Sequence, residues 1–213
     1  LIGGENRVRQ ATTRQDEKGG PVQVRIEYDG ALRQATWTVF PTGWISLDYE
    51  YELNGPFDVF GIGFDYPESK MQAMRFLGRG PHRVWKNRLK GGTFNLWRNQ
   101  YKNDIPGVTW DFPEFKGYYR DWRWVVFETA EGEITVVNAT PELYLGVYRP
   151  DDGPFPANTK LSLPDTGLAF LHGIPPIGTK FDKPQVLGPQ SQKNEAAGTY
   201  KGTLWFHFDA QGK

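Results

Sequence analysis

Alternation of apolar and polar side chains, broken at short intervals by turn residues, constrains the fold of this chain more than any other feature. In "PVQVRIEY", Val22, Val24, Ile26 and Tyr28 alternate with polar residues, which is typical of a strand with one face in water. The runs "QATWTVF" and "WISLDYEYEL" follow, and the turn signals Asp-Gly, Pro-Thr-Gly and Asn-Gly-Pro come after the three runs in order. The sequence therefore predicts an antiparallel meander.

The same pattern continues toward the C-terminus. "RWVVFETAEGEITVVNA" predicts a hairpin about Glu131 and Gly132. The run "TYKGTLWFHF" places four apolar residues on one face of a strand, namely Tyr200, Leu204, Phe206 and Phe208. Only "TPELYLGVYR" could hold one helical turn, because 25 Gly, 16 Pro, 8 Trp, 10 Tyr and 14 Phe favour short strands and turns. We expect an all-β fold, an antiparallel β-sandwich, since many antiparallel strands must cover their apolar face with a second sheet.

The first twenty residues differ from the rest. Residues 1–20 are polar, flanked by glycines and without a period, which indicates a flexible leader or linker. Residues 21–213 then form a single β-sandwich domain in this interpretation. We find no repeat, heptad or low-complexity tract in them.

Charge and composition exclude several classes of partner. Lys plus Arg and Asp plus Glu are equal at 25 each, so no net field attracts a polyanion, and we expect no nucleic-acid partner. No apolar run approaches the roughly 20 residues of a membrane helix, so we expect no membrane contact. The chain has no cysteine, which excludes disulfides and a thiol nucleophile. A periplasmic or extracellular location is slightly favoured, although the cysteine count does not decide it.

The stretch "FLGRGPHRVWKNR", residues 76–88, ends an apolar run with two glycines and a proline. Gly78, Gly80 and Pro81 predict a tight turn. The turn would be followed by a loop that presents cationic side chains beside an aromatic ring and could bind a polyol or an anion. The candidate binding residues on this loop are Arg79, His82, Trp85 and Arg88. The alternative is that Arg88 pairs with a carboxylate and Trp85 covers an apolar edge.

A second candidate cluster is "TWDFPEFKGYYRDWRW", residues 109–124, in which Trp110, Glu114 and Arg120 are the candidate ligand-binding residues. Sugars are bound by aromatic faces together with carboxylates and guanidinium groups, and loops on a rigid scaffold could bring these residues near the first stretch. By strand alternation Trp122 and Trp124 share a face, which favours a place in the core. The three histidines lack the short spacing of a metal site.

The order of these motifs resembles the C-terminal β-sandwich of glycoside hydrolase family 2 β-galactosidases, a domain with the galactose mutarotase-like supersandwich fold. The strand "FGIGFDYP", residues 60–67, is followed by "LGRGP" at 77–81 and then by Arg88, which is similar to a strand and loop of that family. Pro113, Glu114, Gly117 and Arg120 resemble a later element, and residues 188–191 resemble its last loop. The likeness covers about residues 45 to 210, and it implies that the chain holds the supersandwich or a large part of one.

The resemblance implies a non-catalytic C-terminal accessory domain that closes one side of an active site on a separate catalytic barrel domain. It implies carbohydrate as ligand, that barrel as partner, and no cofactor, metal or catalytic residue in this chain. The family's Glu-Asn-Tyr is Arg83-Val84-Trp85 here, and residues 190–192 lack the tryptophan that the family's last loop lends to galactose, so the sugar is not specified. The alternatives are a free-standing mutarotase-like sugar epimerase and a carbohydrate-binding module.

Overall fold

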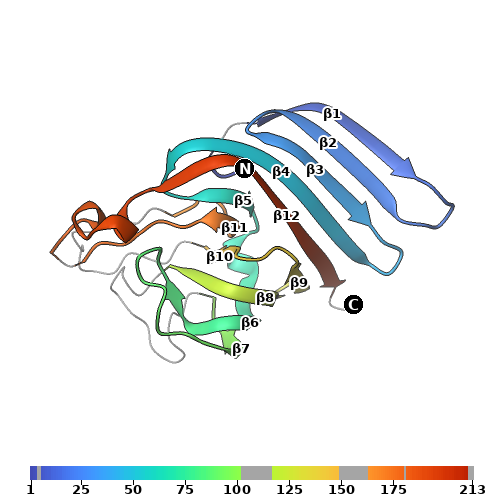
Figure 1. The fold of residues 1–213 in the computed structure, drawn as a ribbon. Coiled ribbons are helices and arrows are strands. Elements are labelled where there is room, and N and C mark those ends of the chain that lie inside the picture. The colour runs from blue at the N-terminus through green and yellow to red at the C-terminus, as the bar shows by residue number, and fades with distance from the viewer. Residues whose placement is uncertain (4–5, 102–116, 149–162, 180, 211–213) are drawn as a thin grey trace.

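The structure, a computed structural model, describes residues 1–3, 6–101, 117–148, 163–179 and 181–210 (Figure 1). These residues contain antiparallel strands and short 3₁₀ turns but no α-helix, which confirms the all-β prediction. No helix in the described ranges is long and apolar enough to span a membrane. The elements in chain order are β1 (Asn6–Gln15), β2 (Val22–Gly30), β3 (Leu32–Val39), β4 (Trp44–Phe57), β5 (Phe60–Phe64), η1 (Glu68–Lys70), β6 (Met71–Val84), β7 (Thr93–Asn99), β8 (Tyr118–Thr129), β9 (Gly132–Asn138), β10 (Tyr144–Val147), β11 (Leu168–Gly173), η3 (Pro184–Val186), η4 (Pro189–Ser191) and β12 (Asn194–Ala210).

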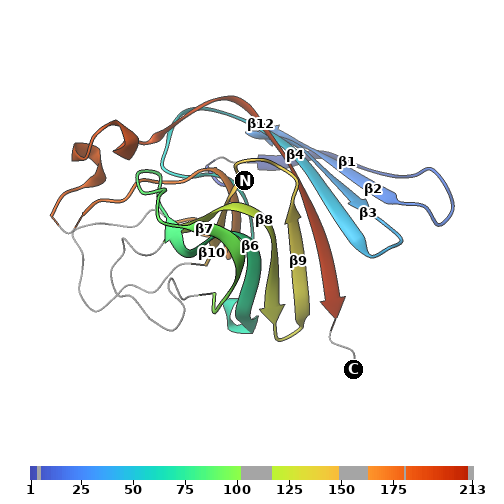
Figure 2. The ribbon, with the colours of Figure 1, turned by 60° about the horizontal axis from the view of Figure 1, so that its bottom comes forward.

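The described strands form one curled sheet that folds back on itself like a sandwich or half-barrel (Figures 1 and 2). Its order is β1-β2-β3-β4-β12-β9-β8-β10-β11-β5, and β6 branches from β8 and carries β7. The longest pairing joins β12 to β4, from Asn194 opposite Phe57 to His207 opposite Trp44. Strands β10, β11 and β5 thereby lie over the other strands, as the predicted sandwich requires.

The core lies between these two layers. Phe170 of β11 packs against Trp122 of β8, with ring centroids 5.6 Å apart, and Phe64 of β5 packs against Trp37 of β3 and Phe206 of β12. A smaller buried cluster sits beside the main core and consists of Val84, Trp85, Tyr118, Ala169, Leu171, Ile174 and Ile177. Burial of large aromatic side chains is the main source of stability in such a fold.

The meander and the hairpin are confirmed. Strands β2, β3 and β4 pair in succession, and β8 and β9 join through the turn at Glu131.

Two local expectations differ from the structure. "TPELYLGVYR" contains strand β10 instead of a helical turn. In place of the loose leader expected over residues 1–20, Asn6–Gln15 forms strand β1, paired with β2. Nearly all of β1 is exposed, so backbone hydrogen bonds hold it, and side-chain alternation could not signal it.

The predicted turn at Gly78, Gly80 and Pro81 is wrong, because all three residues lie within strand β6. The glycines serve close packing instead. A Cβ on Gly78 would lie 2.9 Å from Trp122 Cα, and one on Gly80 would lie 2.8 Å from Trp97 Cδ1. In the β6–β8 ladder, register shifts on both sides of Arg79 accommodate this stretch.

Trp122 and Trp124 do not share a face, although simple alternation predicted that they do. Trp122 is 1% exposed and lies in the main core, whereas Trp124 pairs with Leu77 and is only half-buried. Between the pairs Leu77–Trp124 and Arg79–Arg120, β8 uses more residues than β6. This bulge, where Asp121 has a left-handed φ of 51°, shifts the alternation by one residue.

Strands β1 to β3 project beyond the second layer, so part of the inner face of the sheet lies open (Figures 1 and 2). Cross-strand pairing places Val22 opposite Val39 and Val24 opposite Trp37 on this face. Val39 is 43% exposed and Phe208 is 55% exposed. We call this surface the open face and define it by Val22, Val24, Ile26, Val39, Ile45 and Phe208.

Candidate functional site

A hollow of about 340 Å³ lies where β8, β11 and the connection from β9 to β10 meet. This volume falls in the range of small-molecule sites, about 300–1,000 Å³. We call it the arginine hollow, and its lining residues are Arg120, Asp121, Glu142, Leu143, Tyr144 and His172.

Asp121 joins two of the arginines that the sequence singled out. Arg79 Nε donates to Asp121 Oδ2 at 2.7 Å, and Arg120 Nε lies 3.5 Å from the same oxygen. The Asp121 side chain is 46% exposed, so such a pair contributes only about 0–1 kcal/mol to stability. Its effect is to fix two guanidinium groups at the rim of the hollow.

The backbone of the hollow adopts an unusual conformation at two places. Asp121 and Glu142 both have left-handed φ values, 51° and 66°, and within the described ranges Tyr148 is the other non-glycine residue with positive φ. This conformation is uncommon outside glycine and concentrates at ligand-binding and active sites. The observation therefore favours a functional role for this end of the sandwich.

His172 is neutral and fixed in one tautomer. Burial lowers its pKa, and the hydrogen bond to the Lys201 carbonyl opposes that change. The carbonyl can only accept, so His172 Nε2, 3.3 Å away, carries the proton. Nδ1 then accepts from the Tyr51 hydroxyl at 2.6 Å. Both ring nitrogens are thus occupied by protein partners, and the imidazole acts as a structural support, not as a free base.

The remaining wall is Tyr144, whose pKa is raised by burial, with Asp121 and Glu142 adding to the effect and Arg120 opposing it. The hollow therefore presents a neutral phenol between guanidinium and carboxylate groups. Such a mixture of donors and acceptors suits the hydroxyl groups of a neutral ligand. No group of three or more His, Asp or Glu side chains in the described ranges could hold a metal ion.

The structure brings together only part of the predicted site. Arg79 and Arg120 meet at Asp121. Trp85 is 1% exposed and packs edge-on against Tyr118 at 5.6 Å, so its indole face is covered by protein and not presented as a platform. Trp110 and Glu114 lie outside the described residues, so their proximity to the arginines stays a prediction.

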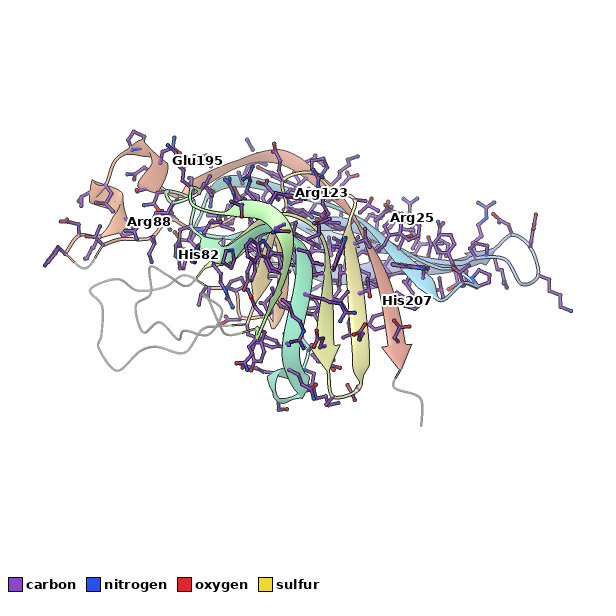
Figure 3. All side chains as sticks on the ribbon, turned by 90° about the horizontal axis from the view of Figure 1, so that it is seen from below. Arg25, His82, Arg88, Arg123, Glu195 and His207 are labelled. Atoms are coloured by element: carbon purple, nitrogen blue, oxygen red, sulfur yellow. The ribbon has the colours of Figure 1, made fainter. Side chains whose placement is uncertain are left out.

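His82 and Arg88 follow in the same stretch, on the side of the molecule away from Arg25 and His207 (Figure 3). His82 is exposed. Arg88 donates from its guanidinium to the Gly178 carbonyl at 3.0 Å and closes a bridge with Trp85 through backbone hydrogen bonds. These contacts differ from the carboxylate pairing considered for Arg88, and the guanidinium holds the segment after β6 against Gly178.

Sequence reasoning missed Glu142, Tyr144 and His172 as neighbours of Arg120. His172 lies in β11 and Tyr144 begins β10, and only the pairing of β10 with both β8 and β11 brings them together. No local pattern encodes which strands become neighbours. The turn residues before Tyr144 were the one available signal, because connections at the ends of strands often carry binding groups.

Comparison with known proteins adds one match. The family model described as beta galactosidase small chain matches residues 4–162, which is more than half of the chain. No curated protein matches the chain.

Proposed function

Because the chain belongs to the beta galactosidase small chain family, we propose that it is a non-catalytic accessory domain of a β-galactosidase-like glycoside hydrolase. In this role it helps to shape a carbohydrate-binding active site whose catalytic carboxylates belong to another part of the enzyme. We also propose that its curled sheet is part of a galactose mutarotase-like supersandwich.

The open face is the observation that carries this proposal. An apolar sheet face that is left uncovered marks an interaction surface in a soluble protein. On this chain Val22 of β2 lies opposite Val39 of β3, and Val39 lies opposite Ile45 of β4. Val24 and Ile26 continue the surface along β2, and Phe208, 55% exposed, extends it onto β12. We propose that the catalytic polypeptide of the enzyme covers this face.

The arginine hollow supports the carbohydrate part of the proposal. It combines Arg120, Asp121, Glu142 and the neutral phenol of Tyr144 around one concavity, and Arg79 holds Asp121 in place. Vicinal sugar hydroxyls can donate to the carboxylates and accept from the guanidinium groups. We propose that this hollow contacts sugar or the sugar-binding loops of the catalytic polypeptide.

Two substitutions on neighbouring residues of β2 test the role of the open face. Val24 points into the open face, whereas Gln23 is exposed on the opposite side of the same strand. We expect Val24→Glu to weaken association with the catalytic polypeptide and to lower the activity of the assembled enzyme, because a carboxylate buried in an apolar interface is costly. Gln23→Glu adds the same charge where it stays in water and should change neither.

Association can be measured by analytical ultracentrifugation of the chain mixed with the catalytic polypeptide, with activity measured on an aryl galactoside. Equal association of the Val24→Glu and Gln23→Glu variants would show that the open face is not the contact. Tight glycan binding by the chain, with no change in the activity of the catalytic polypeptide, would favour a carbohydrate-binding module instead.

A further inference from the structure

Strand β7 forms an edge of the sheet. It pairs with β6 from Thr93 to Asn99, and no other described strand pairs with it. Figure 1 shows β7 at the lower border of the labelled strands. Trp97 fixes its position, because the indole Nε1 donates to the Gly78 carbonyl at 3.2 Å and the ring packs against the main core. The strand is therefore held firmly on one side, while its other side carries no strand in the described part of the chain.

The backbone groups of alternate residues face the open edge of β7. Leu96 shows which residues these are, because its amide donates to the side chain of Asn95 at 2.8 Å and so points away from β6. In an antiparallel strand the N–H and C=O of one residue point to the same side, and this side alternates along the strand. The backbone groups of Phe94, Leu96 and Arg98 therefore face the open edge.

The side chains of the same three residues are exposed on the face of β7 opposite to Trp97. Phe94 is 49% exposed and Leu96 is 57% exposed. The Arg98 side chain is 67% exposed, and Glu128 of β8 holds its guanidinium through two hydrogen bonds. Large apolar side chains on an exposed strand edge favour pairing with another chain.

Two other edges of the described sheet are protected in ways that β7 is not. Strand β1 carries three arginines, and a register shift after Val8 interrupts it. Charges and bulges are common means by which a strand edge avoids pairing. On β5, Ile2 covers part of the edge through a bridge to Gly61. The apolar and regular edge of β7 is therefore the one suited to pairing.

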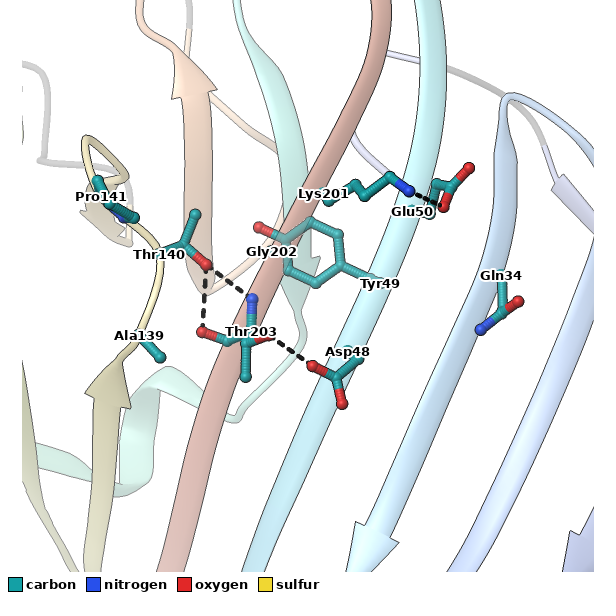
Figure 4. Close-up of a pocket in the computed structure, with 10 residues that line it drawn as sticks. All are labelled: Gln34, Asp48, Tyr49, Glu50, Ala139, Thr140, Pro141, Lys201, Gly202 and Thr203. Atoms are coloured by element: carbon teal, nitrogen blue, oxygen red, sulfur yellow. Dashed lines mark hydrogen bonds and ion pairs between the residues drawn. The ribbon is translucent and has the colours of Figure 1, made fainter.

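The polar surface beside β12 differs from β7, because its side chains already pair with one another. A hollow of about 350 Å³ lies there (Figure 4). Thr203 Oγ1 donates to Asp48, and the Thr203 amide donates to Thr140 Oγ1 at 2.7 Å. Lys201 Nζ lies 2.8 Å from Glu50 Oε2. Exposed apolar side chains such as those of β7 cannot be satisfied in this way and leave water only by contact with other apolar groups.

The sequence of β7 fits a second copy of itself. When two β7 strands pair antiparallel about a two-fold axis at Leu96, Leu96 lies opposite Leu96 of the second copy and Phe94 lies opposite Arg98. These are the residues whose backbone groups face the edge, so both hydrogen bonds of each opposed pair can form. A carbonyl of the second copy then replaces the Asn95 side chain as acceptor for the Leu96 amide.

Charge also favours this register. Arg98 is the one charged residue of β7, and the two-fold pairing places it opposite an aromatic ring and not opposite a like charge. Phe94 of the second copy can pack on the apolar stem of Arg98, whose guanidinium is already held by Glu128. The same pairing of two β1 strands would bring arginine-rich edges together.

We propose that two copies of this chain associate through their β7 strands into a two-fold dimer with one continuous sheet across the contact. Leu96 lies opposite Leu77 of β6, and Leu77 lies opposite Trp124 of β8. Leu77 and Trp124 are half-buried, so they extend the apolar surface beyond the edge strand. The proposal does not depend on the accessory role, because β7 and the strands of the open face stand at different ends of the sheet order.

Sedimentation equilibrium of the 213-residue chain over a range of concentrations measures this association. Leu96→Lys places two like charges opposite each other at the two-fold axis, and we expect it to weaken dimerisation about tenfold or more. Val8→Lys is the matched control, because Val8 is 63% exposed on the edge strand β1, and it should leave the dimer unchanged. Thermal melting of both variants shows that they stay folded, as expected for exposed positions.

Single cysteines test the register, because the chain has no cysteine of its own. In the proposed dimer the two thiols of a Leu96→Cys variant lie beside each other, within reach of a short bismaleimide. Thr93 lies three residues from the axis in each copy, so the thiols of a Thr93→Cys variant stand about 20 Å apart. We expect a cross-linked dimer from Leu96→Cys and none from Thr93→Cys.

A monomer at all concentrations up to the millimolar range would overturn the proposal. A dimer that Leu96→Lys and Val8→Lys weaken equally would overturn it too, as would equal cross-linking of Thr93→Cys and Leu96→Cys. A dimer that is lost in Val24→Glu and kept in Leu96→Lys would show that two open faces pair instead.

Discussion

Replacing Gly78 by alanine should destabilise the chain, because β6 passes very close to β8 at this residue. The new Cβ would lie 2.9 Å from Trp122 Cα and 3.1 Å from Trp122 Cβ. A backbone atom cannot rotate away, so the two strands must separate beside a tryptophan that is 1% exposed. Overpacking of this kind typically costs about 1–3 kcal/mol.

Gly92→Ala is the matched control for this substitution. Its Cβ would meet its nearest neighbours at 3.4 Å, which is ordinary van der Waals contact. Both substitutions remove the same flexibility from the unfolded chain, an effect of about 0.4–1 kcal/mol, so the difference between them isolates the clash in the folded state. For a chain of this size, 1–3 kcal/mol corresponds to about 2–12 °C in melting temperature.

Urea denaturation and thermal melting of the two variants measure this difference. We expect Gly78→Ala to unfold at lower urea with an unchanged dependence on denaturant, since the native contact is strained and the exposed surface is the same. Equal midpoints for Gly78→Ala and Gly92→Ala would refute the close approach of β6 and β8, and with it the interpretation of the glycines as packing residues.

Three further predictions concern the other parts of the chain. Burial lowers the pKa of His172 in the folded state, so the unfolded chain binds a proton first as the pH falls. Stability should therefore decrease as the pH drops through about 6.5, by at most about 1.4 kcal/mol per pH unit. Urea midpoints at pH 5 and 7.5 should show a smaller loss of stability in His172→Gln, whose amide still donates and accepts. Trp85→Ala should lower the free energy of unfolding by about 3–5 kcal/mol while leaving the sugar affinity unchanged, and lost affinity without lost stability would restore Trp85 as a binding platform. Asp121→Asn keeps a residue that tolerates the left-handed backbone, so it should change stability by only about 0–1 kcal/mol. It should nevertheless raise the KM of the assembled enzyme, and an unchanged KM would show that the arginine hollow is not part of the binding site.

Local sequence patterns predicted the strands well where one face is buried and the other is wet. Val22, Val24 and Ile26 alternate with exposed residues in β2, as expected. Strand β1 escaped prediction because both of its faces are exposed, so its polar side chains carry no periodic signal. Gly78 and Gly80 misled the interpretation, because a glycine that permits a turn and a glycine that permits close packing look alike in sequence.

Long-range features could not be predicted from local patterns. The shared face expected for Trp122 and Trp124 is lost through a bulge at Asp121, and bulges shift alternation without a distinctive sequence. The meeting of Arg79 and Arg120 at Asp121 depends on the pairing of β6 with β8. The place of His172 in the arginine hollow depends further on the pairing of β11 with β10, and β11 follows β8 by tens of residues.

The most direct test of the accessory role is turnover of an aryl galactoside by the 213-residue chain alone and after addition of the catalytic polypeptide. We predict no turnover by the chain alone, and higher activity or stability of the catalytic polypeptide when the chain is added. Turnover by the purified chain without any partner would contradict a non-catalytic accessory domain.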